Sequence, residues 1–193
     1  MTKVREVVWR RVVDDLSFEH AVLARAADAV TIAGTVLAAE QDAPLRLDYA
    51  VDCDAAWRTR RATLDFAYAG ARTTKVLEHD GAGGWRIDGR PAAALAGCTD
   101  VDIGLTPSTN AVAINRLRLA AGETGAAKAA WVRFPALEIV AAEQSYQRID
   151  DRHYRYRNAD SGFEAVVEVD EDGLPIDYAD IWRRIAEGPG SPR

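Results

Sequence analysis

Alternation of apolar and polar residues dominates this sequence, and it constrains the fold more than any other feature. The clearest example is LRLDYAVDCD, residues 45–54. Apolar side chains occupy every second position of this run, with polar and charged residues between most of them. That is the period of a strand with one buried face. Such a strand is stable only as part of a larger sheet whose apolar face is covered.

The same alternation recurs along the chain. Further clear examples are TRRATLDFAYAG (59–70), HYRYRN (153–158) and GFEAVVEVDEDGLPIDY (162–178), and in the last of these Asp172-Gly173 predicts a hairpin turn. The sequence DGAGG at 80–84 predicts another turn and not a phosphate-binding loop, because no helix follows it. Weaker runs predict strands at 6–13, 18–25, 30–38, 73–79, 85–88, 101–105, 129–134 and 143–149.

One segment, residues 110–121, has the character of a helix. Pro107 suits a first helical turn, Thr106 or Ser108 can cap it, and Gly122 suits its end. Most of its surface is apolar, so we expect the helix to be enclosed by other elements. A short second helical turn is also compatible with residues 179–185.

The strands continue from one end of the chain to the other without a linker or a shift in composition. We therefore expect a single domain over residues 1–187, followed by a disordered tail at 188–193 with the sequence GPGSPR. A sheet of so many strands must curl or split to bury its apolar face. The predicted fold is mainly β (α+β), with a long antiparallel sheet curled around one central helix.

Composition and motifs exclude several classes of function. The net charge is −6 and the basic residues are dispersed, which disfavours nucleic-acid binding. The first residues, MTKVREVVWRR, have no apolar run typical of a signal peptide, and the most apolar stretch, 26–40, is too short to span a membrane. We therefore expect no signal peptide and a cytoplasmic location. Cys53 and Cys98 have no CxxC spacing and are expected to be free thiols. No metal-ligand or cofactor motif is present, so we predict neither a metal nor a cofactor.

Several long motifs carry a resemblance to a known family. They are WRIDGRPAAALAGCTDVDIGLTPSTNAVAINRL (85–117), AAWVRFPALEI (129–139), EQSYQRID (143–150), YRYRN (154–158) and VDEDGLPIDYADIWRR (169–184). In these motifs the sequence resembles the "putative glycolipid-binding" family, formerly a family of unknown function. The resemblance covers most of the chain.

This resemblance implies a spiral β-roll, in which an antiparallel sheet wraps around a single helix, and a homodimer. The family's architecture is similar to that of bacterial lipoprotein carriers and mycobacterial lipoproteins that hold acyl chains. It therefore implies a glycolipid or another hydrophobic small molecule as partner. The ligand would be held between the curled sheet and the central helix without catalysis.

Two carboxylates near the start of the helix leave an alternative open. Asp100 and Asp102 are two positions apart in a predicted strand, so their side chains point the same way. Such a pair can bind a divalent cation or share a proton, which would suit an enzyme acting on a small polar substrate. The pair can equally be structural, capping the next turn or pairing with Arg116 and Arg118.

Polar residues at the helix entrance would face the headgroup of a bound ligand. Aromatic residues beside arginines, such as Trp131 near Arg133, suit a sugar or phosphate above an apolar slot. Ordinary strand alternation, with aromatic side chains inward and arginines outward, explains the same pattern. A dimeric structural or interaction module without a ligand is a third alternative. The candidate ligand-binding residues are Asp100, Asp102, Thr109, Asn110, Arg116 and Trp131.

Overall fold

The computed structural model describes residues 2–14 and 16–188, which form one sheet of 15 strands together with one α-helix and one short 3-10 helix. Of the predicted tail at 188–193, residues 189–193 lie outside the described residues, whereas Gly188 ends the last strand. The elements are β1 (Lys3–Arg11), β2 (Ser17–Arg25), β3 (Ala29–Glu40), β4 (Ala43–Asp54), β5 (Thr59–Tyr68), β6 (Ala71–His79), β7 (Trp85–Ile87), β8 (Arg90–Pro91), η1 (Ala93–Leu95), β9 (Asp100–Ile103), α1 (Asn110–Leu117), β10 (Thr124–Arg133), β11 (Glu138–Arg148), β12 (His153–Asn158), β13 (Glu164–Val169), β14 (Pro175–Tyr178) and β15 (Trp182–Gly188).

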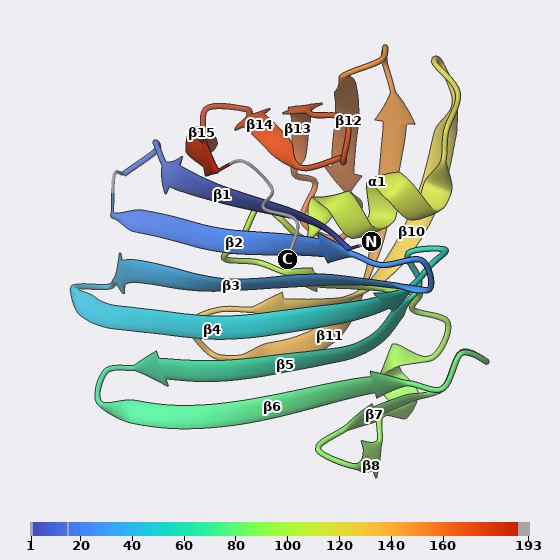
Figure 1. Ribbon diagram of the computed structural model, residues 1–193. Helices are drawn as coiled ribbons and strands as arrows, with labels where there is room; N and C mark the ends of the chain where they lie inside the picture. Colours follow the sequence, from blue (N-terminus) through green and yellow to red (C-terminus); the bar gives the residue numbers. More distant parts are fainter. Residues whose placement is uncertain (1, 15, 189–193) are drawn as a thin grey trace.

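The sheet is continuous but does not close, and its strand order is β8-β7-β6-β5-β4-β3-β2-β1-β15-β14-β13-β12-β11-β10-β9. Pairing of β1 with β15 joins the N-terminal and C-terminal halves. Figure 1 shows the sheet curling so that β10 and β11 pass behind β4 and β5. A bond of 3.2 Å from the Val101 N–H to Thr59 Oγ1 connects β9 to β5 across the interior. The predicted long, curled sheet is confirmed.

One edge of the sheet departs from the predicted antiparallel pairing. Strands β9 and β10 pair in parallel, whereas the other described pairs are antiparallel. The chain leaves β9, passes through α1 and returns as β10 beside the strand it left. A crossover of this kind brings the second strand back in the same direction. The parallel edge is thus a direct consequence of placing the helix inside the sheet.

The predicted strand faces agree with the observed burial. In β4, the alternate residues Leu47 and Val51 have no exposed surface. The segment HYRYRN coincides with β12. The helical turn considered at 179–185 is wrong, because Ala179 and Asp180 take positive φ in a tight turn between β14 and β15.

Helix α1 is shorter than the predicted 110–121. It ends at Leu117, because Arg118 adopts a left-handed conformation with φ of 48° and donates its N–H to the Ile114 carbonyl. Such a residue ends a helix without glycine. Gly122 comes too late to be the helix stop and instead donates its N–H to the Arg148 carbonyl.

Helix α1 begins at Asn110 as predicted, but Pro107 lies before its first turn and its capping differs from the expectation. The N-cap position is Thr109, and no side chain caps the helix. The hydroxyl of Thr106 instead accepts a bond of 2.9 Å from the Ser108 N–H and so stabilises the turn before the helix. The side chains of these three residues face polar groups on other elements, which is why none of them is available as a cap.

Gly34 lies in the middle of β3, where the side chain of Tyr49 crosses it. A Cβ atom at this position would lie 2.7 Å from both the His20 carbonyl oxygen and the Tyr49 hydroxyl. The carbonyl belongs to the backbone of β2 and cannot retreat without disturbing strand pairing. We therefore expect Gly34→Ala to lower the free energy of unfolding by about 1–3 kcal/mol in chemical denaturation. Gly188→Ala is the control, because there the nearest atom lies at 3.4 Å; equal stability of both variants would contradict the prediction.

Candidate functional site

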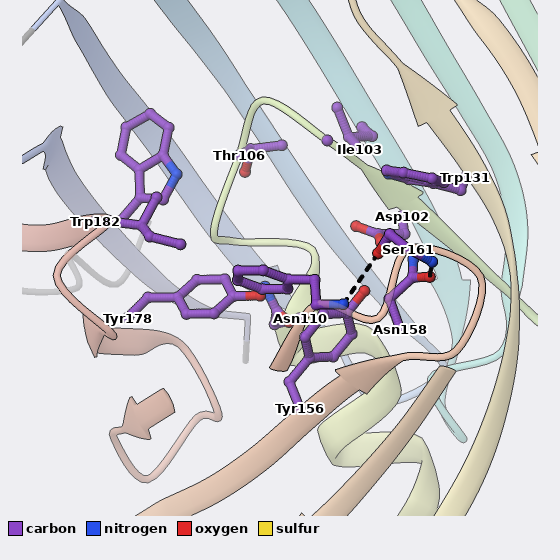
Figure 2. A pocket seen from close by; sticks show the side chains of 13 residues that line it. Asp102, Ile103, Thr106, Asn110, Trp131, Tyr156, Asn158, Ser161, Tyr178 and Trp182 are labelled. Carbon is purple, nitrogen blue, oxygen red and sulfur yellow. Dashed lines mark hydrogen bonds between the residues drawn. The ribbon is translucent and has the colours of Figure 1, made fainter. Parts of the chain in front are cut away.

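A cavity of about 200 Å³ opens at the N-terminal end of α1. Its walls come from the β9–α1 connection, from β10, from β12 with the following turn, and from the β14–β15 turn. Figure 2 shows Asp102 and Trp131 on one side, with Tyr178 and Trp182 on the other. The lining residues are Asp102, Ile103, Gly104, Thr106, Asn110, Trp131, Tyr156, Asn158, Ser161, Phe163, Tyr178, Ile181 and Trp182.

Aromatic rings form much of the wall. Tyr156, Phe163 and Tyr178 pack against one another, with ring centroids 6.0 to 6.4 Å apart and tilted or edge-on planes. Trp131 is half-buried at the opposite wall, and the guanidinium of Arg133 lies 5.3 Å from its ring centroid. Tilted and edge-on arrangements at these distances are the favoured geometry for aromatic pairs. The cavity therefore has aromatic side chains on two opposite walls.

Asp102 is the carboxylate that borders this cavity. Its Oδ2 accepts a bond of 2.6 Å from the Gln144 amide, and its Oδ1 accepts a longer bond of 3.4 Å from the Thr109 hydroxyl. Burial raises the pKa of Asp102, while these two donors act in the opposite direction. No arginine, lysine or histidine lies among the described lining residues. The carboxylate is held by neutral donors alone.

Two amide side chains complete the polar part of the wall. The Oδ1 of Asn110 accepts a bond of 2.9 Å from the Tyr146 hydroxyl, and its Nδ2 donates to the Pro107 carbonyl at 3.0 Å. The Oδ1 of Asn158 accepts from the backbone N–H groups that follow it, including that of Ser161 at 3.0 Å. These bonds hold both amides in one orientation at the cavity.

The predicted pair of carboxylates is divided between two environments. Asp100 is 2% exposed and forms a two-bond ion pair with Arg116, with both N···O distances 2.7 Å. Neither residue lines the cavity. Thr109 lies behind the wall and orients Asp102. Of the predicted site residues, Asp102, Asn110 and Trp131 are therefore the ones that border the cavity.

The sequence pattern did not single out several of the lining residues. Tyr178 and Trp182 come from the far end of the chain, and their role depends on the β14–β15 turn that brings them opposite Trp131. Trp57 and Trp85, which directly precede Arg58 and Arg86, are 3% exposed and belong to the core. Trp85 follows the ordinary strand pattern in β7, whereas Trp57 packs inward from the β4–β5 turn, where it takes a φ of 63°.

A second cavity, of about 390 Å³, adjoins the first and shares Trp131 and Trp182 with it. Its further lining includes the apolar side chains Leu105 and Phe134. Arginine side chains also line this cavity, and they pair with glutamates: Arg11 with Glu40 at 2.8 Å and Arg133 with Glu138 at 3.4 Å.

A buried polar cluster lies behind Thr106. Glu19 on β2 has no exposed surface, and its Oε1 accepts hydrogen bonds from the hydroxyls of Tyr49 and of Thr106, the latter at 2.7 Å. Ser108 bonds to both hydroxyls at 2.6 Å. Within the described residues, Glu19 Oε2 has no hydrogen-bond partner.

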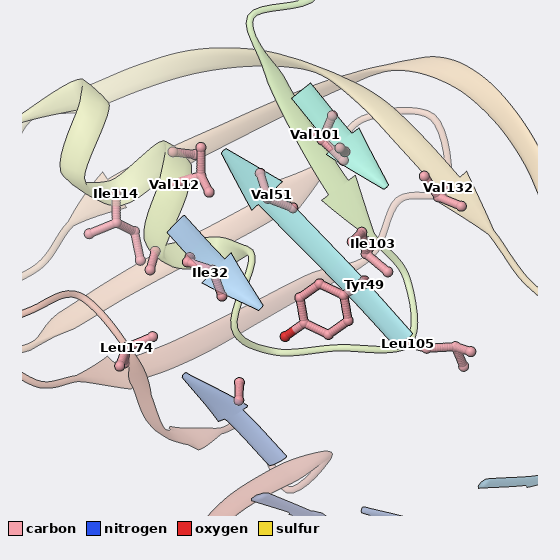
Figure 3. Close-up of a cluster of buried hydrophobic side chains, with 14 of the residues drawn as sticks. Ile32, Tyr49, Val51, Val101, Ile103, Leu105, Val112, Ile114, Val132 and Leu174 are labelled. Carbon is pink, nitrogen blue, oxygen red and sulfur yellow. The ribbon is translucent and has the colours of Figure 1, made fainter. Parts of the chain in front are cut away.

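This cluster places a carboxyl group in an apolar interior. Figure 3 shows Tyr49 among buried side chains that include Ile32 and Val51. Burial raises the pKa of Glu19 to about 7, although the hydroxyl donors oppose the shift. The sequence reading missed this cluster because Glu19 falls in an ordinary alternating strand and its partners are distant in the chain.

Comparison with known proteins places these observations in a family. Residues 6–184 match the family described as "Putative glycolipid-binding". The chain belongs to this family. A crystal structure of a DUF1089 family protein from Pseudomonas aeruginosa is similar over 88% of this chain and 92% of that chain, with 36% sequence identity and a TM-score of 0.81. A comparison with curated proteins gave no match.

Membership of the glycolipid-binding family supports a binding role for this chain. Both cysteines, Cys53 and Cys98, are buried free thiols, as predicted. Within residues 2–14 and 16–188, no helix is long and apolar enough to cross a membrane. The same residues contain no group of three or more histidine, cysteine, aspartate or glutamate side chains arranged to hold a metal ion.

Proposed function

We propose that this protein binds the glycosyl headgroup of a glycolipid in the cavity at the N-terminal end of α1. The observation that carries the proposal is the combination of aromatic rings with fixed planar polar groups around one cavity. A sugar ring has apolar C–H faces that pack on aromatic side chains and a rim of hydroxyls that donate to carboxylate and amide oxygens. Trp131 and Trp182 supply rings here, and Asp102, Asn110 and Asn158 supply polar atoms.

The size of the cavity favours a headgroup over an acyl chain as its occupant. Its volume of about 200 Å³ is below the ~300–1,000 Å³ of pockets for larger ligands. We expected the ligand between the sheet and the helix, but Ala111 and Val112 of α1 have no exposed surface and fill that region. In this proposal the lipid chain leaves through the adjoining cavity, along Leu105 and Phe134.

The proposed role is binding without catalysis. Hydrolysis of a glycosidic bond ordinarily uses two carboxyl groups on either side of that bond. Asp102 is the one carboxylate among the described lining residues, and Asp100 is engaged by Arg116. The observed arrangement therefore favours binding over the enzymatic alternative. The homodimer, the cytoplasmic location and the single domain over residues 1–187 stay predictions.

Trp131→Ala is expected to weaken sugar binding at least about tenfold, because a tryptophan at the centre of a binding site commonly contributes that much. Isothermal titration calorimetry with octyl glucoside, octyl galactoside and octyl mannoside, each below its critical micelle concentration, measures the affinity. Octanol is the control without a sugar and should give no comparable binding.

Phe18→Ala provides a matched variant outside the cavity, since Phe18 is 46% exposed on the outer face of β2. It should bind the glycosides as the wild type does. Trp131→Phe keeps a ring at the wall and should lose less affinity than the alanine variant. Equal affinity for octanol and the octyl glycosides, or wild-type glycoside binding by Trp131→Ala, would contradict the proposed function.

A further inference from the structure

The one acidic or basic side chain among the described lining residues of the cavity is an aspartate. Asp102 brings a carboxylate to the wall, and the other polar side chains among the described lining residues, Thr106, Asn110, Asn158, Ser161 and the tyrosines, are neutral. A partly buried carboxylate without a cationic partner is an unusual arrangement, because burial alone disfavours the charge. A ligand that carries positive charge would supply the missing partner.

The charged groups on the surrounding elements do not neutralise Asp102. Behind it, on the same strand, Asp100 is paired with Arg116. Across the cavity, the Glu19 carboxyl lies behind Thr106 and adds no positive charge. The arginines of the adjoining cavity lie beyond Trp131, where each is already paired with a glutamate.

The N-terminal end of α1 does not favour an anionic ligand in this cavity. A helix N-terminus carries partial positive charge and favours a negative group beside it. Asp102 lies beside this end, where its Oδ1 accepts a bond of 3.4 Å from the hydroxyl of Thr109, the N-cap residue. A second negative group in the cavity would be repelled by Asp102 instead of gaining from the helix.

We propose that the headgroup recognised in this cavity carries an amino group, and that Asp102 binds its ammonium ion. The inference rests on the proposed function and narrows the ligand to amino sugars, with phosphorylated or carboxylated sugars disfavoured. Glycosides whose amine is acetylated keep the ring and lose the charge, so they should bind like the neutral sugars.

The test compares matched pairs of sugars: glucose with glucosamine, galactose with galactosamine, and mannose with mannosamine. Ligand-observed NMR titration at neutral pH gives the affinities, and N-acetylglucosamine and glucose 6-phosphate serve as neutral and anionic controls. We expect at least one amino sugar to bind about tenfold more tightly than its neutral partner, which is typical of a hydrogen bond to a charged group. Glucose 6-phosphate should bind more weakly than glucose.

Asp102→Asn retains the shape and the acceptor for Gln144 but removes the negative charge. This variant should lose the preference for the amine, so that each amino sugar binds no more tightly than its neutral partner. Asp65→Asn is the control, because Asp65 pairs with Arg72 on the surface, and it should keep the preference. If Asp102→Asn fails to fold, the comparison of amino sugars with neutral sugars on the wild-type protein still tests the inference.

The outcomes separate this inference from the function on which it rests. Equal binding of amino and neutral sugars, with both lost in Trp131→Ala, would overturn the inference and leave the headgroup site intact. Tighter binding of glucose 6-phosphate would also overturn it. Absence of binding by every sugar and every octyl glycoside would overturn the inference and the proposed function together.

Discussion

Replacing Arg116 with methionine is expected to lower the free energy of unfolding by about 3–5 kcal/mol, the largest effect among the single substitutions proposed. The guanidinium forms two bonds of 2.7 Å to the Asp100 carboxylate, whose side chain is 3% exposed. Methionine keeps most of the apolar stem but leaves the carboxylate buried without a partner. Urea denaturation followed by circular dichroism measures the loss.

The double variant Asp100→Asn/Arg116→Met distinguishes the lost ion pair from lost packing. Removing both charges takes away the buried unpaired group, so the double variant should be more stable than Arg116→Met alone. Arg183→Met is a surface control, because the Arg183–Asp177 pair is exposed, and it should change stability by less than about 1 kcal/mol. A loss below about 1 kcal/mol in Arg116→Met would show that the ion pair does not hold α1 to β9.

Glu19 is expected to make the protein less stable as the pH rises from 4.5 to about 7, because burial raises its pKa from 4.5 to about 7. Below pH 4.5 the carboxyl group is protonated in both the folded and the unfolded chain. Between the two values the unfolded chain loses this proton and the folded chain keeps it. The free energy of unfolding therefore falls by about 3 kcal/mol across this interval and stays level above it.

Glu19→Gln removes this titration while keeping an oxygen that accepts from Tyr49 and Thr106. The free energy of unfolding of the variant minus that of the wild type should increase by about 3 kcal/mol between pH 4.5 and 7.5. The surface carboxylates titrate in both proteins, so their contribution to the pH dependence of stability cancels in this difference. A difference that does not change with pH would mean that Glu19 is not buried as a neutral acid.

Much of the fold follows from local sequence patterns. Alternation at period two located β4, β5, β12 and β13, because each strand buries one face and exposes the other. The helix start was located near Asn110 by Pro107 and the apolar run that follows. The end of α1 was misplaced because a left-handed arginine, which ends the helix at Leu117, has no sequence signature comparable to glycine.

The cavity was less accessible to sequence reasoning, because its walls come from distant segments. Asp102, Asn110 and Trp131 were singled out because they lie near the strand-to-helix junction. Tyr178 and Trp182 approach them only because β1 pairs with β15, which brings the C-terminal turn across the opening. Sheet order is set by the whole chain, so no local pattern could place these two rings opposite Trp131.

A crystal structure of the protein in complex with a soluble octyl glycoside that it binds tests the central claim most directly. The account predicts that the sugar ring lies in the cavity at the N-terminal end of α1, between Trp131 and Trp182, with a polar substituent in hydrogen-bond contact with Asp102. The octyl chain should extend along Leu105 and Phe134. A sugar bound on the outer face of the sheet, or an alkyl chain in place of the sugar beside Asp102, would contradict it.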